Sequence, residues 1–272
     1  MKITKFHTGI ALTTSLLLAA LTGCGAANTA SSSGSASSST SVSASSNSTK
    51  KHTSFFVKDN GDGTKVIKDI DGKEVTVPTN PERIADLWHA NNQVVLLLGG
   101  AEKLVSTTTN VKSLAWFKQV YPGIEKVDAP VKGTDVNMEQ LLADKPEVLL
   151  ASSKEQIAKA AEAGIPAVHV EFQNFADLKR TVELTAEVIG TDEAIERAEK
   201  YLAYLEKNEN LIKERLQGVT ESPKVLHIAG GSDLTKVDGS NSLIGEWMKL
   251  SGAKNSLDGV ENLKNISLEQ II

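Results

Sequence analysis

The chain has 272 residues, of which 40% are hydrophobic and 23% charged, and its formal net charge at pH 7 is −5. That hydrophobic content is enough for a packed core, and the acidic balance argues against a nucleic-acid partner, which requires a basic surface. The single cysteine excludes a disulfide framework within the chain and a thiolate metal site.

Residues 1–23 have the layout of a secretory signal peptide. A short basic start, Met1 to Lys5, precedes an apolar stretch from Ile10 to Leu21, and small residues follow it. The apolar stretch of about 12 residues is too short to span a bilayer of roughly 30 Å as a helix. The sequence has no second run of about 18 apolar residues, so no other segment is expected to span a membrane.

The segment Leu21-Thr22-Gly23-Cys24 resembles the lipobox of bacterial lipoproteins. The resemblance implies cleavage before Cys24, acylation of that cysteine with palmitate-type chains, and anchoring to the outer face of the cytoplasmic membrane. The alternative is a free thiol after an ordinary signal peptide. The mature chain, residues 24–272, would carry a net charge of −7. Its Ser-rich start, residues 24–54, cannot bury a core and is expected to be a flexible tether that reaches about 30 Å.

Ordered structure is expected from Phe55. A hairpin is predicted over residues 65–70 and 74–77, because Asp71-Gly72 between them is a favourable hairpin turn. From Arg83 onward strand and helix patterns alternate, which predicts a mainly parallel α/β sheet. The expected strands are 84–88, 104–108, 147–151 and 167–172, and the expected helices are 92–98, 113–121, 138–144 and 155–163.

Two helices interrupt this alternation, over residues 175–189 and 191–218. Thr191 can cap the second helix, and its apolar residues recur at helical spacing over roughly 39 Å. Because the α/β pattern then resumes, this helix is expected to be a rigid spine between two lobes, residues 55–174 and 219–272. A coiled-coil or packing helix is the alternative. In the second lobe we expect a strand over 224–231 and a helix over 242–251.

An internal repeat links the two lobes. Residues 136–142 match residues 266–272 in residue type at every position. The second residue of each copy, Asn137 or Ser267, is a good N-cap residue. Glu139 and Glu269 therefore occupy the same early helical position and are expected to be exposed. The first copy continues into further strands and helices and the second does not, so the second lobe is expected to be incomplete. The alternative is coincidence between two short amphipathic helices.

Several short motifs follow the tether in a fixed order. They are Asn80-Pro81-Glu82-Arg83-Ile84, Leu98-Gly99-Gly100-Ala101-Glu102-Lys103-Leu104-Val105, Asn137-Met138-Glu139-Gln140-Leu141-Leu142, Lys145-Pro146-Glu147-Val148-Leu149-Leu150 and Ala163-Gly164-Ile165-Pro166. No single motif is decisive, but their order resembles the substrate-binding lipoproteins of ABC importers for iron–siderophore, haem and cobalamin-type metal chelates. The resemblance covers Phe55 to Ile272.

This resemblance implies the class III periplasmic-binding-protein fold, in which one long rigid helix joins two Rossmann-like α/β lobes. It implies a monomeric binding protein without enzymatic activity or catalytic cofactor, which delivers its ligand to an ABC permease and its ATPase. The expected ligand is an iron complex of the siderophore type, with haem, cobalamin, a nickel or cobalt chelate, or a bare transition metal ion as alternatives. Glu139 and Glu269 match the family's docking glutamates, which pair with permease arginines; solvated surface acids are the alternative.

Ligands of parallel α/β lobes bind beyond the carboxyl ends of the strands. That rule selects segments after the first two expected strands and after the first strand of the second lobe. The predicted ligand contacts are Trp88, His89, Asn91, Asn92, Thr109, Gly231 and Ser232. Trp116 and Trp247 on nearby expected helices are added, because an indole offers a large flat face and one donor. Core packing is the alternative for both.

His89, at a strand end, is the candidate metal ligand, because it could complete the coordination of a metal already held by a chelator. His169 and His227 lie within apolar strands and are expected to be buried and structural. None of the four arginines falls in a predicted cleft segment, so a neutral or weakly charged chelate is favoured over an anionic catecholate.

The sequence lacks a Gly-x-Ser-x-Gly elbow, a His-Glu-x-x-His motif and a phosphate loop, which argues against an enzyme. A structural or adhesive lipoprotein is the remaining alternative.

Overall fold

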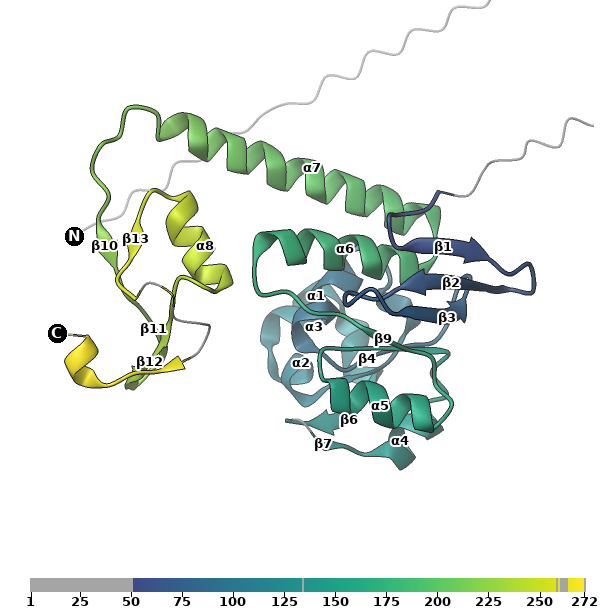
Figure 1. The fold of residues 1–272 in the computed structure, drawn as a ribbon. Helices are drawn as coiled ribbons and strands as arrows, with labels where there is room; N and C mark the ends of the chain where they lie inside the picture. Colours follow the sequence, from purple (N-terminus) through teal and green to yellow (C-terminus); the bar gives the residue numbers. More distant parts are fainter. Residues whose placement is uncertain (1–50, 134, 258, 260–263, 272) are drawn as a thin grey trace, which may run out of the picture. The chain divides into compact units, whose positions relative to one another are not determined.

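The computed structural model describes residues 51–133, 135–257, 259 and 264–271 (Figure 1). Cys24 and most of the predicted tether lie outside these residues. Within the part that is described, no helix combines the length and the apolar character needed to cross a membrane.

A three-stranded antiparallel sheet begins the described chain. It contains β1 (Phe56–Asp59), β2 (Thr64–Lys68) and β3 (Glu74–Pro78), in that order. The predicted hairpin is confirmed, and Gly72 in its turn has a φ of 86°, a conformation that favours glycine. Strand β1 was not predicted, because its residues are mostly exposed and show no apolar alternation.

A six-stranded sheet follows, with the strand order β7-β6-β5-β4-β8-β9. All neighbouring pairs are parallel except β6 and β7, so the expected mainly parallel sheet is confirmed. Strands β6 and β7 were not predicted. The six strands are β4 (Ile84–Asp86), β5 (Leu104–Thr108), β6 (Asp128–Lys132), β7 (Asp135–Val136), β8 (Val148–Ala151) and β9 (Ala167–His169).

The helices and 3-10 turns around this sheet are α1 (His89–Leu97), η1 (Ala101–Lys103), α2 (Thr109–Ser113), α3 (Ala115–Val120), η2 (Pro122–Lys126), α4 (Met138–Ala143), α5 (Lys154–Glu162) and α6 (Phe175–Ile189). Two expectations were inaccurate. Helix α1 begins at His89 rather than at residue 92. The single helix expected over 113–121 is two helices, because the extended backbone of Leu114 separates α2 from α3.

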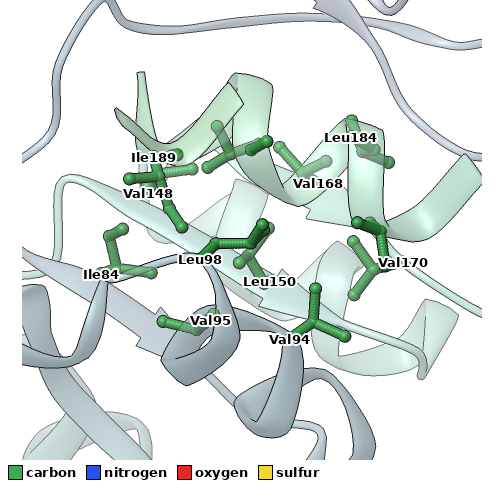
Figure 2. Packing of buried hydrophobic residues seen from close by; sticks show 14 of the residues in the cluster. Ile84, Val94, Val95, Leu98, Val148, Leu150, Val168, Val170, Leu184 and Ile189 are labelled. Carbon is green, nitrogen blue, oxygen red and sulfur yellow. The ribbon is translucent and has the colours of Figure 1, made fainter. Parts of the chain in front are cut away.

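The inner strands of the six-stranded sheet are buried on both faces. In β8, Val148 and Leu150 belong to one apolar cluster with residues of α1 and α6, as Figure 2 shows. The alternate residues, Leu149 and Ala151, belong to a second cluster with residues of α4 and α5. A strand covered on both faces is apolar at every position, which explains why β8 reads as a continuous apolar run.

Helix α7 (Asp192–Arg215) follows α6 after a single sharp break. Gly190 ends α6 with a φ of 76°, and a Cβ there would lie 2.1 Å from the carbonyl oxygen of Thr79, so only glycine fits. The Thr191 hydroxyl accepts a hydrogen bond from the backbone N–H of Ala194 at 3.1 Å and caps α7, as predicted. A long uninterrupted helix was expected over 191–218, and α7 forms one over Asp192–Arg215. Its role as a spine between two lobes stays a prediction.

After α7, short strands form two further sheets. Strands β10 (Lys224–Val225) and β13 (Lys254–Asn255) pair in parallel, whereas β11 (His227–Gly230), β12 (Asp233–Asp238) and β14 (Lys264–Asn265) form an antiparallel sheet. The one strand expected over 224–231 is therefore divided between two sheets. Helix α8 (Leu243–Leu250) and the 3-10 turn η3 (Leu268–Gln270) complete the described elements.

A buried ion pair joins the first sheet to α6. Lys65 of β2 is fully buried, and its ammonium lies 2.9 Å from the carboxylate of Glu187. Glu187 itself is 1% exposed. The same carboxylate accepts hydrogen bonds from the backbone and hydroxyl of Thr53 and contacts the ring of His52. Burial alone would raise the pKa of Glu187, but the charge of Lys65 and these hydrogen bonds outweigh it and lower that pKa.

We expect Lys65→Met to lower the free energy of unfolding at pH 7 by about 3–5 kcal/mol, because it leaves the Glu187 charge buried without its partner. Urea unfolding followed by circular dichroism measures the loss. Lys51→Met is the matched control, since the Lys51 side chain is 47% exposed and its ion pair with Glu196 should contribute no more than about 1 kcal/mol.

This effect should depend on pH. A carboxylate with a lowered pKa in the folded state stabilises the protein above its unfolded pKa, about 4.3, and that contribution disappears as pH falls through the folded pKa. The difference between wild type and Lys65→Met should therefore be greatest near neutral pH and shrink in acid. A difference that is constant from pH 7 to pH 3 would show that the ion pair is not its cause.

Candidate ligand-binding site

A polar pocket of about 300 Å³ lies where β4, β5 and β8 end. Its lining combines hydroxyl and amide side chains with one indole and one imidazole, and none of its residues is an acid, a lysine or an arginine. The lining residues are Leu87, Trp88, His89, Thr108, Thr109, Asn110, Gly133, Ser152, Ser153 and Gln156. The pocket therefore has the location that the carboxyl-end rule predicts.

Three helices begin at the border of this pocket. Helix α1 starts at His89, α2 starts at Thr109, and α5 starts after Ser153. The hydroxyls of Thr108 and Ser153 cap α2 and α5 by accepting backbone hydrogen bonds at 3.2 and 3.4 Å. The amino ends of helices carry partial positive charge, so these three helix starts bring partial positive charge to the border of a lining without cationic side chains.

A buried polar network underlies the Trp88–His89 turn, the two residues at which the chain from β4 enters α1. Asp86, the last residue of β4, is fully buried and accepts hydrogen bonds from the backbone of Trp88 at 3.1 Å and from the side-chain amide of Asn91 at 3.0 Å. The amide of Asn92 donates to the backbone oxygen of Asp86 at 2.9 Å. Burial raises the pKa of Asp86 well above its ordinary value, against the opposing effect of the two donors.

Of the predicted contacts, the structure brings Trp88, His89 and Thr109 to this pocket. It does not bring Asn91 and Asn92 there. Both are fully buried in α1, and their side chains bond to Asp86 and to other protein groups, so they contribute to the protein interior rather than to the pocket lining.

The prediction missed Ser152, Ser153 and Gln156 of the lining. The signal was present, because Ser152 and Ser153 directly follow the strand β8, which the sequence had predicted. The carboxyl-end rule applied to this third strand would have selected them.

The other two tryptophans lie away from the polar pocket. Trp116 is 37% exposed and lines an apolar pocket of about 700 Å³ that also includes Phe172 and Tyr201. Trp247 is 44% exposed and packs edge-on against Phe175, with ring centroids 4.8 Å apart.

Gly231 and Ser232 form the tip of the antiparallel β11–β12 hairpin and are exposed. They follow β11 as expected, but β11 belongs to an antiparallel sheet. The rule for parallel sheets used to select them therefore does not apply to that strand.

The two strand histidines differ. His169 is 3% exposed, as expected, and its ring nitrogens lie 3.0 Å from Asp71 and 3.1 Å from the carbonyl of Ser152. His227 was expected to be buried, but its side chain is 43% exposed and pairs with Asp238 at 2.8 Å. That expectation was wrong, because β11 leaves even its apolar residue Ile228 exposed. Among the described residues no group of three or more His, Cys, Asp or Glu side chains is arranged to hold a metal ion.

Glu139 and Glu269 occupy matching positions, as the repeat predicted. Each is exposed and is the second residue of a helical turn, in α4 and η3. Asn137 caps α4 by accepting the backbone N–H of Gln140 at 3.1 Å, and Ser267 forms a capping box with Gln270. Backbone and Ser267 hydrogen bonds lower the pKa of Glu269, which favours its charged form.

A second polar pocket, of about 590 Å³, lies at the opposite, amino ends of the strands. Arg83, Glu102, Asp128 and Asp144 are among its lining residues. Burial and the neighbouring carboxyl of Asp128 raise the pKa of Asp144, which also accepts a hydrogen bond from Ser106 at 2.6 Å. Ligands of parallel sheets bind at the carboxyl ends, so this pocket is not the candidate site.

Comparison with known proteins places these observations in a family. Residues 84–272 match the family described as periplasmic binding protein. The chain is 24% identical over 200 residues to an uncharacterized ABC transporter substrate-binding lipoprotein of Bacillus subtilis, YvrC, covering 70% of this chain and 60% of YvrC. It is 24% identical over 234 residues to the molybdate-binding protein MolA of Haemophilus influenzae, covering 76% of this chain and 66% of MolA. The chain thus spans less than two thirds of either relative.

Solved structures have the same fold. MolA bound to molybdate matches with a TM-score of 0.67 at 24% identity, over 76% of this chain and 70% of MolA. Helicobacter pylori CeuE in complex with nickel and histidine matches with a TM-score of 0.63 at 20% identity, over 77% of this chain and 68% of CeuE. These matches support the expected α/β periplasmic-binding-protein fold of the class III type.

We expect Asn92→Ala to destabilise the protein by about 1–3 kcal/mol, because it removes the donor to Asp86 and Trp88 and leaves the buried hydroxyl of Thr107 without its acceptor. Thr109→Ala, at an exposed position of the pocket, should change stability by no more than about 0.5 kcal/mol. Thermal unfolding of the two variants measures the contrast. Equal losses would contradict the separation of pocket lining from interior.

Proposed function

Because this chain belongs to the periplasmic binding protein family, we propose that it is the extracytoplasmic solute-binding component of an ABC importer. In this proposal the acylated Cys24 anchors a monomer to the outer face of the cytoplasmic membrane, and the protein passes its ligand to a permease with its ATPase. The observation that carries the proposal is the polar pocket at the carboxyl ends of β4, β5 and β8, in a chain whose family binds solutes. The name of YvrC, a substrate-binding lipoprotein, supports the anchoring.

The proposed ligand is a metal chelate, with an iron complex of the siderophore type as first choice. The lining residues of the pocket include no acid and a single histidine, so they suit a metal that arrives with its coordination shell largely complete. Trp88 offers an aromatic face to the chelator, and His89 offers one nitrogen to the metal or to a polar group. A nickel or cobalt chelate suits the same surfaces, whereas haem or cobalamin would also need a surface beyond this pocket of about 300 Å³. A bare transition metal ion would need more ligands than the lining supplies.

A small oxyanion is the second candidate ligand. Four hydroxyl side chains line the pocket, at Thr108, Thr109, Ser152 and Ser153, and three helices begin at its border. Neutral donors and helix amino ends together can hold an oxyanion without a cationic side chain. The relative MolA is named for molybdate, which favours this candidate over other anions.

Glu139 and Glu269 are the proposed docking residues. Both are exposed on capped helical turns that follow a short antiparallel strand, β7 before α4 and β14 before η3. Two carboxylates in equivalent settings suit charge-assisted pairing with permease arginines.

We expect a ferric hydroxamate complex to quench the intrinsic tryptophan fluorescence and to raise the melting temperature in a saturable way. Haem, cobalamin, nickel–histidine and sodium molybdate complete the panel. Trp88→Ala or His89→Ala should weaken the preferred ligand by about tenfold or more, roughly 1.4 kcal/mol, whereas the control His227→Ala should not. Binding of molybdate alone would select the oxyanion candidate, and binding of nothing in the panel would contradict the proposal.

We expect Glu139→Arg and Glu269→Arg each to abolish uptake in cells that carry the permease, because a guanidinium would then face the permease arginines. Ligand affinity of the purified variants should stay unchanged. Glu162→Arg, an exposed acid on α5, is the matched control and should transport normally. Weakened ligand binding with normal uptake would contradict the docking assignment.

A further inference from the structure

We infer that Asp86 is a positioning residue for the ligand pocket, which holds the Trp88–His89 turn in its binding conformation. The inference rests on the proposed function, because it takes the pocket at the carboxyl end of β4 as the ligand site. Asp86 itself does not line that pocket. It acts through the backbone of Trp88, and the side chain of Trp88 lines the pocket.

The carboxyl of Asp86 makes two separate attachments. One oxygen accepts the backbone N–H of Trp88 at 3.1 Å, which ties it to the turn itself. The other accepts the amide of Asn91 at 3.0 Å, which ties it to the first turn of α1. A single side chain thus bonds both halves of the segment that runs from β4 into α1, and the turn between them is held at two points.

The network continues into neighbouring elements. Asn91 accepts the hydroxyl of Thr185 of α6 at 3.0 Å, and Asn92 accepts the hydroxyl of Thr107 of β5 at 2.7 Å. All of these side chains are fully buried. The turn is therefore held by the sheet and by α6, and does not depend on the ligand to order it.

A role in packing alone would not require a hydrogen-bond acceptor here. In the described part of the chain, the donors to the Asp86 carboxyl are a backbone N–H and an amide, not a cation. Burying a carboxyl without a cation is costly, and an apolar residue would avoid that cost. An apolar residue, however, could not accept the N–H of Trp88 or orient Asn91. The buried acid is explained by the bonds that it makes to the turn.

The test uses the chain with Trp116→Phe and Trp247→Phe, in which Trp88 is the only tryptophan. Asp86→Ala and Asp86→Asn are introduced into this background. Asp144→Asn is the matched control, because Asp144 is also a buried acid of raised pKa but lies at the opposite ends of the strands. Quenching of Trp88 by acrylamide and its emission maximum are measured with the fold checked by circular dichroism.

For Asp86→Ala we expect the quenching constant of Trp88 to rise by about twofold, since a turn that has lost its anchor opens locally more often. Asp86→Asn should restore the wild-type value, because the amide oxygen that it introduces can accept the Trp88 N–H. The amide of Asn91 then has to rotate by about 180°. After this rotation its oxygen accepts from the introduced amide, and its NH₂ group donates to the hydroxyl of Thr185. The control should match the background. Affinity for the ferric hydroxamate probe, or for molybdate, should fall in the Ala variant and recover in the Asn variant.

Unchanged quenching and emission in a folded Asp86→Ala protein would overturn the inference, and so would an equal change in the Asp144→Asn control. If Asp86→Ala does not fold, Thr185→Val replaces it, since it removes only the hydroxyl that bonds Asn91 and should raise the quenching constant by a smaller factor. The fluorescence measurement needs no ligand. Failure of the whole ligand panel with altered Trp88 quenching would thus refute the proposed function, while still showing that Asp86 anchors the Trp88–His89 turn.

Discussion

The pairing of β4 on both of its sides is the constraint on which the candidate site depends. This strand has only three residues, all buried, and it pairs in parallel with β5 and with β8. The backbone N–H of Leu87 donates to the carbonyl of Leu150 at 2.9 Å and extends the pairing beyond the strand. The chain must then turn at Trp88 into α1, at the same edge where β5 and β8 end. Parallel pairing thus places the three pocket-forming segments together, although they are distant in sequence.

Two of the buried acids, Glu187 and Asp86, are compensated in different ways. Glu187 is paired with a buried cation, Lys65, and its bonds to Thr53 also fix the start of the described chain against α6. Among the described residues, Asp86 accepts from a backbone N–H and a side-chain amide, and its pKa is raised rather than lowered. The first arrangement couples the first sheet to α6 through charge. The second fixes the passage from β4 into α1 through hydrogen bonds to the Asp86 carboxyl.

The sequence predicted the layered α/β pattern well, because it follows from buried apolar runs such as β8 and from capped helices such as α7. It predicted the side-chain directions less well. The carboxyl-end rule selects a segment, and within the first turn of α1 the 3.6-residue period sends Asn91 and Asn92 inward while His89 stays exposed. His227 was misjudged because an apolar run in a short strand does not guarantee a cover on either face. Strand β7 has only two residues, and β6 contains a proline, which weakens its strand signal.

The charge distribution limits what the pocket can select. Its lining has neither acids nor cations, whereas Glu139 and Glu269 are exposed away from it. A lining of this kind cannot compensate a large net charge, so discrimination must come from size, shape and hydrogen-bond geometry. At about 300 Å³ the pocket is at the lower end of small-molecule sites, which span roughly 300–1,000 Å³. A compact chelate or an oxyanion can be enclosed by such a pocket, while a haem or a cobalamin would need a further surface beyond it. The Trp88–His89 turn decides this fit, because its side chains are the largest in the polar lining.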